Sequence, residues 1–250
     1  MCSSDLPCIV ESDADLSIAA REIAWGKFFN AGQTCIAPDY LLVQKEIGVR
    51  LIQVLKDTLE RFYGLRPQES PDYGRIINAR HFNRIRDLLK EGKIEFGGES
   101  DEKDLYIAPT LVTRIDGSSA IMQEEIFGPV LPILEYESLE EALGFVRSRP
   151  RPLVVYCFSK DSRKQKKVER ETSSGGIAFN ATLAYLLSSS LPFGGVGESG
   201  IGKYHGKASF DRMSHGKSVL KKSFWLRHSL AYPPYSISLA WMKRMFRWML

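Results

Sequence analysis

Cysteine 35 is the residue whose surroundings best suit chemistry. It closes the segment 29–35, Phe-Asn-Ala-Gly-Gln-Thr-Cys, a glycine-containing turn between an expected helix and an expected strand. A thiol on such a turn can attack a carbonyl carbon, and a backbone N–H there can face the carbonyl oxygen. A lone cysteine is more often a small buried apolar residue. The turn alone therefore makes Cys35 a candidate nucleophile, with a core position as the alternative.

Residues 32–40, Gly-Gln-Thr-Cys-Ile-Ala-Pro-Asp-Tyr, resemble the catalytic-cysteine motif of aldehyde dehydrogenases. The Ala-Pro-Asp-Tyr part is similar to family 3, the group that includes fatty aldehyde dehydrogenases. Three further segments resemble the same family in the same order: 122–130 (Met-Gln-Glu-Glu-Ile-Phe-Gly-Pro-Val), 171–176 (Glu-Thr-Ser-Ser-Gly-Gly), and 191–197 with 204–207. Because these ordered motifs cover nearly the whole chain, it resembles the catalytic half of a family 3 aldehyde dehydrogenase.

This resemblance implies a reaction and a cofactor. The Cys35 thiolate would attack an aldehyde to give a thiohemiacetal, hydride would pass to NAD or NADP, and water would hydrolyse the thioester to a carboxylic acid. The resemblance gives the Cys35 N–H half of the oxyanion hole. It places Glu125 on the nicotinamide ribose and Phe127 beside the nicotinamide. Without it, Glu125 would be interpreted as a solvated acid and Phe127 as a core aromatic. The implied substrate is an aliphatic aldehyde of medium to long chain.

Two further polar residues are candidates for active-site support. Asn180 follows an apolar run and either supports the active-site loop or forms a turn. His205 contacts substrate, contributes to a contact between domains, or is structural. A thiol hydrolase or acyltransferase would need a histidine base, and neither His81 nor His205 lies in a recognisable Cys–His pattern. No metal site is expected, because the cysteines form no CxxC pair.

The amino-terminal end departs from the family pattern. In family 3 the segment before this region carries the general-base glutamate; here Met1 stands at that place and similarity resumes at Pro7. We therefore expect the dinucleotide-binding domain, the general base and the second oxyanion donor to be missing. The 250 residues alone are then expected to be inactive, as part of a fuller enzyme. The alternative is a truncated, non-enzymatic paralogue with a membrane or subunit interaction role.

The composition is that of an ordinary globular protein. Of 250 residues, 44% are apolar and 26% charged, which argues against disordered, collagen-like and coiled-coil classes. Scattered cysteines predict reduced thiols, and no secretory signal is recognisable, so a cytoplasmic location is expected. Cys2 and Cys8 have no activating partner, and Cys157 belongs to an apolar run and is expected in the core.

Helical and strand patterns alternate along the chain. This alternation predicts an α/β fold with a mostly parallel sheet flanked by helices, as in the catalytic domain of the aldehyde dehydrogenase fold. The expected helices are one capped by Ser12 with Asp15, then 46–62, 79–90, 161–172, and one from Ser138 to before Pro150. The expected strands are 40–43, 94–96, 110–112, 153–158 and 177–179.

The predicted organisation has three parts: a catalytic domain over 1–202, a C-terminal extension over 203–236 and a basic amphipathic tail over 237–250. From Lys203 onward there are ten Lys or Arg and one acid, Asp211, so this end is strongly basic. In the tail, Lys243, Arg244 and Arg247 share one sector of a helical wheel.

The tail is too short to span a bilayer, yet it suits a helix lying on an anionic membrane surface. Docking on its own body or on a second subunit is the alternative. The expected partners are therefore an aldehyde, a second copy of the full-length protein as a homodimer, and the surface of an intracellular membrane. No nucleic acid is expected.

Overall fold

The computed structural model describes residues 5–225, 233–234 and 238–249. They belong to two compact units, Met1–Met213 and Ser214–Leu250. The first unit carries the expected α/β architecture. Cys2 lies outside the described residues, as do residues 237 and 250 of the tail.

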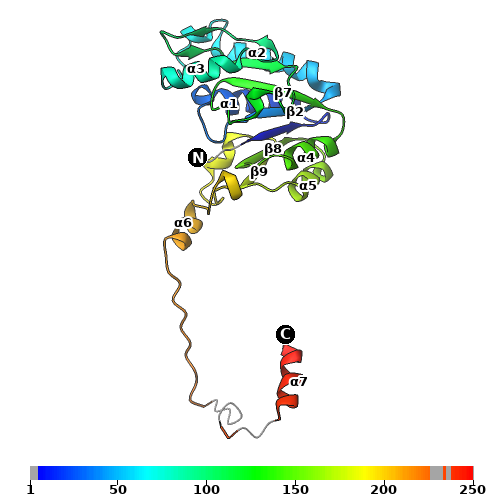
Figure 1. Ribbon diagram of the computed structural model, residues 1–250, viewed down its shortest axis with the longest axis vertical. Coiled ribbons are helices and arrows are strands. Elements are labelled where there is room, and N and C mark those ends of the chain that lie inside the picture. The colour runs from blue at the N-terminus through cyan, green and yellow to red at the C-terminus, as the bar shows by residue number, and fades with distance from the viewer. Residues whose placement is uncertain (1–4, 226–232, 235–237, 250) are drawn as a thin grey trace. The chain divides into compact units, whose positions relative to one another are not determined.

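A seven-stranded sheet in the order β3-β6-β7-β2-β1-β8-β9 forms the centre of the first unit (Figure 1). Its strands pair in parallel except that β3 is antiparallel to β6, which confirms the mostly parallel sheet. Both faces of the central strands are buried, which explains their continuous apolar runs. The strands are Pro7–Val10 (β1), Tyr40–Gln44 (β2), Lys93–Phe96 (β3), Thr110–Thr113 (β6), Val130–Tyr136 (β7), Val154–Phe158 (β8) and Gly176–Phe179 (β9).

Helices cover both faces of this sheet (Figure 1). Helices α1 (Leu16–Phe28) and α2 (Gly48–Tyr63) pack against each other, and α4 (Leu139–Arg147) contacts α5 (Ser162–Glu171) and β7. Helix α3 (Ala79–Leu88) lies beside β5 (Tyr106–Ile107), which forms a short hairpin with β4 (Ser100–Asp101). Helix α1 connects β1 to β2 in one direction along the sheet, whereas α4 and α5 precede β8 and β9 in the other, so right-handed crossovers place them on opposite faces.

Most expected elements are confirmed, and the start of the first helix is a correction. Asp15, not Ser12, caps α1: its Oδ1 accepts from Ser17 N at 3.2 Å and Ile18 N at 3.3 Å. The Ser12 N–H instead donates to Gln44 Oε1 at 2.9 Å, because the loop after β1 must first cross the end of β2. Strands β1 and β7 were not expected; β1 is short, and Pro132 interrupts the strand pattern of β7.

The C-terminal end contains two helices. Helix α6 (Gly206–Arg212) belongs to the first unit, and α7 (Leu239–Met249) belongs to the second. Among the described residues no helix combines the length and apolar character needed to cross a bilayer. On α7, Trp241, Lys243, Arg244 and Arg247 are exposed. A helix is thus present where the sequence predicts an amphipathic tail.

Candidate active site

The thiol of Cys35 lies at the amino-terminal edge of the sheet, in the loop that leads into β2. A short 3-10 turn, η1 (Phe29–Gly32), ends α1, and Cys35 follows it with an exposed side chain. The Tyr156 hydroxyl donates to Ile36 O at 2.7 Å and so holds the residue after the cysteine. Cys8 and Cys157 are buried, which confirms the core position expected of Cys157. Among the described cysteines, Cys35 alone is therefore accessible to a substrate.

The turn before Cys35 is tied to a second loop through Gly32. Gly32 has a φ of 74°, and a Cβ there would lie 2.2 Å from Gly128 O. Only glycine fits this close approach. The contact joins the loop of the candidate nucleophile to residues 125–129, which carry the candidate cofactor-binding side chains.

The turn at 125–127 is held from both sides. Asp39 Oδ1, a buried carboxylate oxygen, accepts from Ile126 N at 3.0 Å. The Arg84 guanidinium donates to Glu125 O at 3.4 Å and also to Ile126 O. Phe127 has a positive φ of 46° and remains 38% exposed. These contacts leave the Phe127 ring accessible on a fixed backbone, which suits a residue that packs beside a flat ligand.

A buried cation lies between the two loops. Lys27, in the last turn of α1, is only 1% exposed, and the carboxylates of Asp39 and Glu125 face it. Burial lowers the pKa of Lys27 to about 8, and the two carboxylates oppose that shift. Burial likewise raises the pKa of Asp39, while Lys27 works against the change. The two facing carboxylates thus offset the cost of burying the Lys27 ammonium, and loss of either would leave that charge less compensated.

The surroundings of Cys35 disfavour ionisation of its thiol. Partial burial raises the pKa of Cys35, the negative charge of Glu125 adds to the increase, and the residue's own N–H opposes it. The Glu125 carboxylate is therefore within electrostatic reach of the sulfur. The N–H that counteracts the increase is the one available to a carbonyl oxygen attacked at Cys35.

Replacing Glu125 by glutamine is expected to lower the pKa of Cys35 and to speed its alkylation by iodoacetamide severalfold near neutral pH. The reason is that the variant removes a negative charge that disfavours the thiolate. Rates measured against pH on the Cys35 peptide test this, with Glu124→Gln, an exposed neighbour, as the control. An alkylation profile unmoved by Glu125→Gln would contradict the electrostatic contact.

A cavity of about 570 Å³ opens beside Cys35. Its wall combines apolar side chains with glycine backbone, and Lys203 and Arg212 add positive charge. A Cβ on Gly194 would lie 2.0 Å from Gly202 O, so only glycine lets these two segments of the wall come together. The lining residues are Cys35, Leu153, Phe193, Gly194, Gly195, Ser199, Gly200, Ile201, Gly202, Lys203, Tyr204, Ser209, Arg212 and Met213. Such a wall suits an apolar substrate tail.

His205 lies close to this cavity. Its ring stacks on Phe193 at 5.9 Å and meets the edge of Tyr204 at 4.7 Å, and both of these aromatics line the cavity. Its backbone is strained, with a φ of 85°. Its Nδ1 atom is buried and has no hydrogen-bond partner among the described residues. His205 therefore supports the aromatic wall of the cavity and is not itself among the lining residues.

Asn180 lies at the other end of the sheet. It follows the carboxyl end of β9, where its side chain accepts from Ser159 N at 3.0 Å and donates to Ser159 O at 3.1 Å. Its φ of 56° makes it a turn residue. The segment that follows Asn180 runs beside α1, where Thr182 Oγ1 donates to Glu22 O at 2.7 Å. Asn180 therefore fixes the start of the returning segment and is not among the residues that line the Cys35 cavity.

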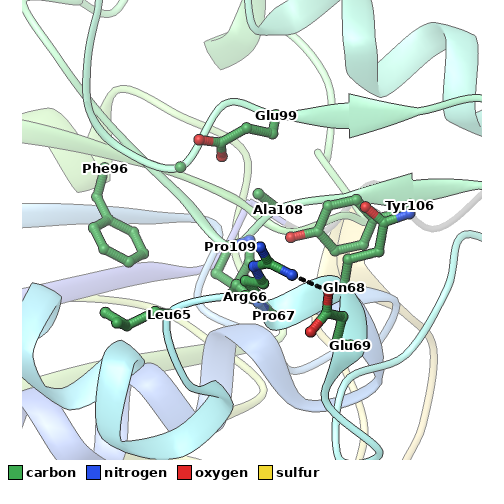
Figure 2. Close-up of a pocket in the computed structure, with 11 residues that line it drawn as sticks. Leu65, Arg66, Pro67, Gln68, Glu69, Phe96, Glu99, Tyr106, Ala108 and Pro109 are labelled. Carbon is green, nitrogen blue, oxygen red and sulfur yellow. Dashed lines mark hydrogen bonds and ion pairs between the residues drawn. The ribbon is translucent and has the colours of Figure 1, made fainter.

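A larger cavity, of about 690 Å³, lies elsewhere, between residues 65–69 and 96–109 (Figure 2). Cys35 is not among its lining residues. Arg66 and Glu69 on its rim form an ion pair at 2.7 Å, drawn as the dashed line. Among the described residues no cluster of His, Cys, Asp or Glu could hold a metal ion.

Four residues of the site were not predicted from the sequence: Lys27, Gln33, Asp39 and Arg84. Gln33 and Asp39 belong to the recognised motif, but no role was predicted for either. Arg84 lies on a helix remote in sequence from Glu125. Lys27 carried a usable signal, because a charged residue between Gly26 and Phe28 on an otherwise apolar helix end needs a buried partner.

The comparisons with known proteins show the family of this chain. The sequence profile of the aldehyde dehydrogenase family matches residues 2–219. The chain belongs to the aldehyde dehydrogenase family. Its relatives include the 4,4'-diaponeurosporen-aldehyde dehydrogenase of Staphylococcus aureus, 50% identical over 96% of this chain and 53% of that protein. Aldehyde dehydrogenase family 3 member A2 of Rattus norvegicus is 50% identical over 95% of this chain and 50% of its own length.

The solved structures give the same family. The substrate-bound state of Staphylococcus aureus AldH superposes with a TM-score of 0.92 at 49% identity, over 98% of this chain and 54% of that one. A betaine aldehyde dehydrogenase of Staphylococcus aureus in complex with NAD+ gives a TM-score of 0.74 at 30% identity, over 84% of this chain and 45% of that one. This aldehyde dehydrogenase chain thus spans about half the length of the curated relatives it matches.

Proposed function

We propose that this chain supplies the nucleophile and part of the nicotinamide site for the NAD- or NADP-dependent oxidation of an aliphatic aldehyde of medium to long chain, within a fuller enzyme. The observation that carries the proposal is the exposed thiol of Cys35 at the wall of an apolar cavity. Family membership supports the reaction type. The apolar wall supports the class of substrate.

Cys35 and the residues of the cavity wall have separate roles in the proposed reaction. The Cys35 thiolate forms a C–S bond to the aldehyde carbon, and its backbone N–H stabilises the resulting oxyanion. Leu153, Phe193 and Ile201 contact the alkyl tail and exclude water from the reacting carbon. With a bound nicotinamide as the hydride acceptor, the thiohemiacetal would become a thioester, which water would cleave to the carboxylic acid and the free thiol.

The 125–127 turn fits one part of a nicotinamide cofactor, which when bound supplies the hydride acceptor. The exposed Phe127 ring offers a flat apolar face, and Glu125 on the same fixed turn offers a carboxylate that can accept from ribose hydroxyls. A related betaine aldehyde dehydrogenase has been solved with NAD+, whereas a relative from Rattus norvegicus is named NADP-preferring. Both cofactors therefore belong in the test.

Activity of the protein at its native length tests the proposal. Its length in the source cells is obtained from a blot with an antibody to this chain, followed by intact mass. Oxidation of acetaldehyde, hexanal, decanal and hexadecanal is then followed by the absorbance of the reduced cofactor, with NAD and NADP separately. We expect kcat/KM to rise with chain length from acetaldehyde to decanal by about 10- to 100-fold, which corresponds to burial of about two to three methylenes of the tail at about 0.8 kcal/mol each. A preference for acetaldehyde would contradict the substrate class.

The 250 residues alone are expected to show no measurable oxidation of aldehydes. Among the described residues, those proposed to contact the cofactor are confined to the 125–127 turn, so the affinity for NAD should be low. The measurement is the same absorbance assay on the purified 250-residue chain. Turnover with NAD that is lost in Cys35→Ser would contradict this expectation.

For the tail we propose binding to an anionic membrane surface through α7. Trp241 on this helix is 53% exposed, and Lys243, Arg244 and Arg247 are exposed as well. Basic residues near anionic lipid contribute about 1 kcal/mol each. The proposed location is accordingly cytoplasmic and peripheral on an intracellular membrane.

Co-sedimentation of the whole chain with vesicles of phosphatidylserine and phosphatidylcholine tests the tail. The triple variant Lys243→Glu, Arg244→Glu, Arg247→Glu is expected to lose binding by at least tenfold, because three attractive charges become repulsive. A matched control changes Lys160, Arg163 and Lys166, in and just before α5, to glutamate. Equal binding by both variants would contradict the role of α7, and would remove the support for the alternative, a non-enzymatic membrane-interacting paralogue.

We also propose a homodimer for the protein at native length. The support is the name of a relative of Rattus norvegicus, aldehyde dehydrogenase, dimeric NADP-preferring, 49% identical over 91% of this chain. Sedimentation equilibrium on the native-length protein tests it.

A further inference from the structure

The side-chain amide of Gln33 makes three hydrogen bonds in the turn before Cys35. Its Nε2 donates to Asn30 O at 3.1 Å and to Arg75 O at 2.9 Å, and its Oε1 accepts from Ile77 N at 2.9 Å. In return, Asn30 Nδ2 donates to Gln33 O at 3.0 Å. One amide therefore joins the nucleophile turn to the segment 75–77, more than forty residues away in the sequence.

The turn that Gln33 holds is strained. Asn30 and Ala31 are both left-handed, with φ of 52° and 51°, directly before Gly32. Each such non-glycine residue costs about 1–2 kcal/mol, so a pair persists only where surrounding contacts impose it. Gln33 bonds the carbonyl of Asn30 directly, and Gly74 lies beside the pair, since a Cβ on Gly74 would be 3.4 Å from Ala31 N. The strained pair is thus braced against residues 74–77.

The segment 75–77 is itself fixed. Arg75 donates to Asp104 at 2.9 Å and to Gln68 O at 2.6 Å, and its guanidinium lies 5.2 Å from the centre of the Tyr106 ring. Ile76 N donates to Leu105 O at 2.9 Å. Gln68 and Tyr106 line the cavity of Figure 2, so this anchor belongs to the body of the domain and not to the site. Gln33 therefore ties a strained turn to a rigid support.

We propose that Gln33 is a positioning residue, which fixes the direction of the Cys35 sulfur and N–H relative to the substrate cavity. This inference rests on the proposed role of Cys35 as nucleophile. When the amide is lost, Asn30 and Ala31 relax toward right-handed conformations and the thiol stays available but misdirected. Displacements of about 1 Å can cost about 10²-fold in rate at a positioned group.

Two reactions of the same sulfur separate positioning from ionisation. Alkylation by iodoacetamide needs the thiolate and access to it. Acylation by p-nitrophenyl acetate forms a tetrahedral oxyanion, so it also needs the Cys35 N–H in the right place; the sulfur bonds to the acyl carbon and p-nitrophenolate leaves. The ratio of acylation to alkylation rates therefore reports the geometry of the turn, and both reactions proceed without any cofactor.

The test measures both rates on the 250-residue chain, with the Cys35 peptide resolved by mass spectrometry. Gln33→Met keeps the length of the side chain and removes its hydrogen bonds. Gln33→Glu keeps an acceptor for Ile77 N but places a carboxylate oxygen next to the carbonyl oxygens of Asn30 and Arg75, which it repels. This second variant is used if Gln33→Met fails to fold. The matched control is Gln53→Met, whose amide makes an exposed bond to Asp57 at 2.8 Å.

We expect the ratio to fall by at least about tenfold in the Gln33 variants, with alkylation within about twofold of wild type and Gln53→Met unchanged. A Cys35-dependent acylation whose ratio is unchanged in both Gln33 variants would overturn the inference alone. Acylation by wild type that persists in Cys35→Ser, or no acylation where Cys35 alkylates, would overturn the proposed nucleophile, and the inference with it.

Discussion

Cys35→Ser is expected to reduce kcat for aldehyde oxidation by the native-length protein by at least about 10⁴-fold. A serine hydroxyl is a far weaker nucleophile at neutral pH than a thiol, and loss of a catalytic nucleophile costs about 10⁴–10⁶-fold in other enzymes. Because Cys35 is exposed, the substitution should leave folding unaffected. The measurements are kcat and the urea midpoint of the variant.

The matched control is Cys157→Ser, the same chemical change at a buried position in β8. It is expected to lower the urea midpoint, because a hydroxyl replaces a thiol in the core, and to leave kcat per folded molecule close to wild type. Comparable loss of kcat in both variants, or a Cys35→Ser enzyme within tenfold of wild type, would contradict the assignment of the nucleophile.

Asp39→Ala is expected to destabilise the fold by roughly 3 kcal/mol, because it removes one of the two carboxylates that offset the buried charge of Lys27 and leaves a buried N–H without its acceptor. The variant leaves the ammonium of Lys27 without one of its two facing carboxylates and leaves Ile126 N without its acceptor. Urea unfolding measures the loss. Asp57→Ala, which removes an exposed carboxylate from α2, is the control and should cost less than about 1 kcal/mol.

The pH dependence of this loss has a definite sign. The pKa of Lys27 is already lowered to about 8, and without Asp39 it falls further below the value in the unfolded chain. Between these two pKa values Lys27 is protonated in the unfolded chain and neutral in the folded one. The variant therefore gains stability as pH rises toward the unfolded pKa of lysine. Its deficit should be larger at pH 6 than at pH 9. A deficit that grows with pH would contradict the pairing.

A double variant completes this test. Lys27→Met with Asp39→Ala removes both charges, and replacing a buried pair by apolar groups is often close to neutral. We expect it to recover only part of the stability lost in Asp39→Ala, because Ile126 N still lacks its acceptor and Glu125 no longer faces the Lys27 ammonium. Additive losses in the two single variants would show that Lys27 and Asp39 do not interact.

Most of the fold could be read from the sequence, for a physical reason. Helices α2, α4 and α5 carry their own local signals, such as the Ser138 cap, the stop at Gly64 and an apolar stripe. Strands β2 and β8 are continuous apolar runs. By contrast β7 contains Pro132 and reveals itself as a strand only by its pairing with β2 and β6.

The site could be found from the sequence only in its motif residues. The turn and the resemblance both pointed to Cys35, and the resemblance alone gave Glu125 and Phe127; the structure places their two loops in contact through Gly32 and Gly128. The supporting residues required coordinates, because their roles depend on contacts across the sheet or between remote segments. Asp39 reaches Ile126 and Arg84 reaches Glu125, and no local pattern encodes either contact.

The most direct test of the account is to trap the covalent intermediate. The native-length protein is mixed with decanal and cofactor, quenched in acid within its first turnover, digested, and mapped by mass spectrometry. We predict a decanoyl group on the peptide that carries Cys35 and on no other cysteine peptide, and none without cofactor. A decanoyl group on another residue, or turnover with an unmodified Cys35 peptide at every quench time, would contradict the account.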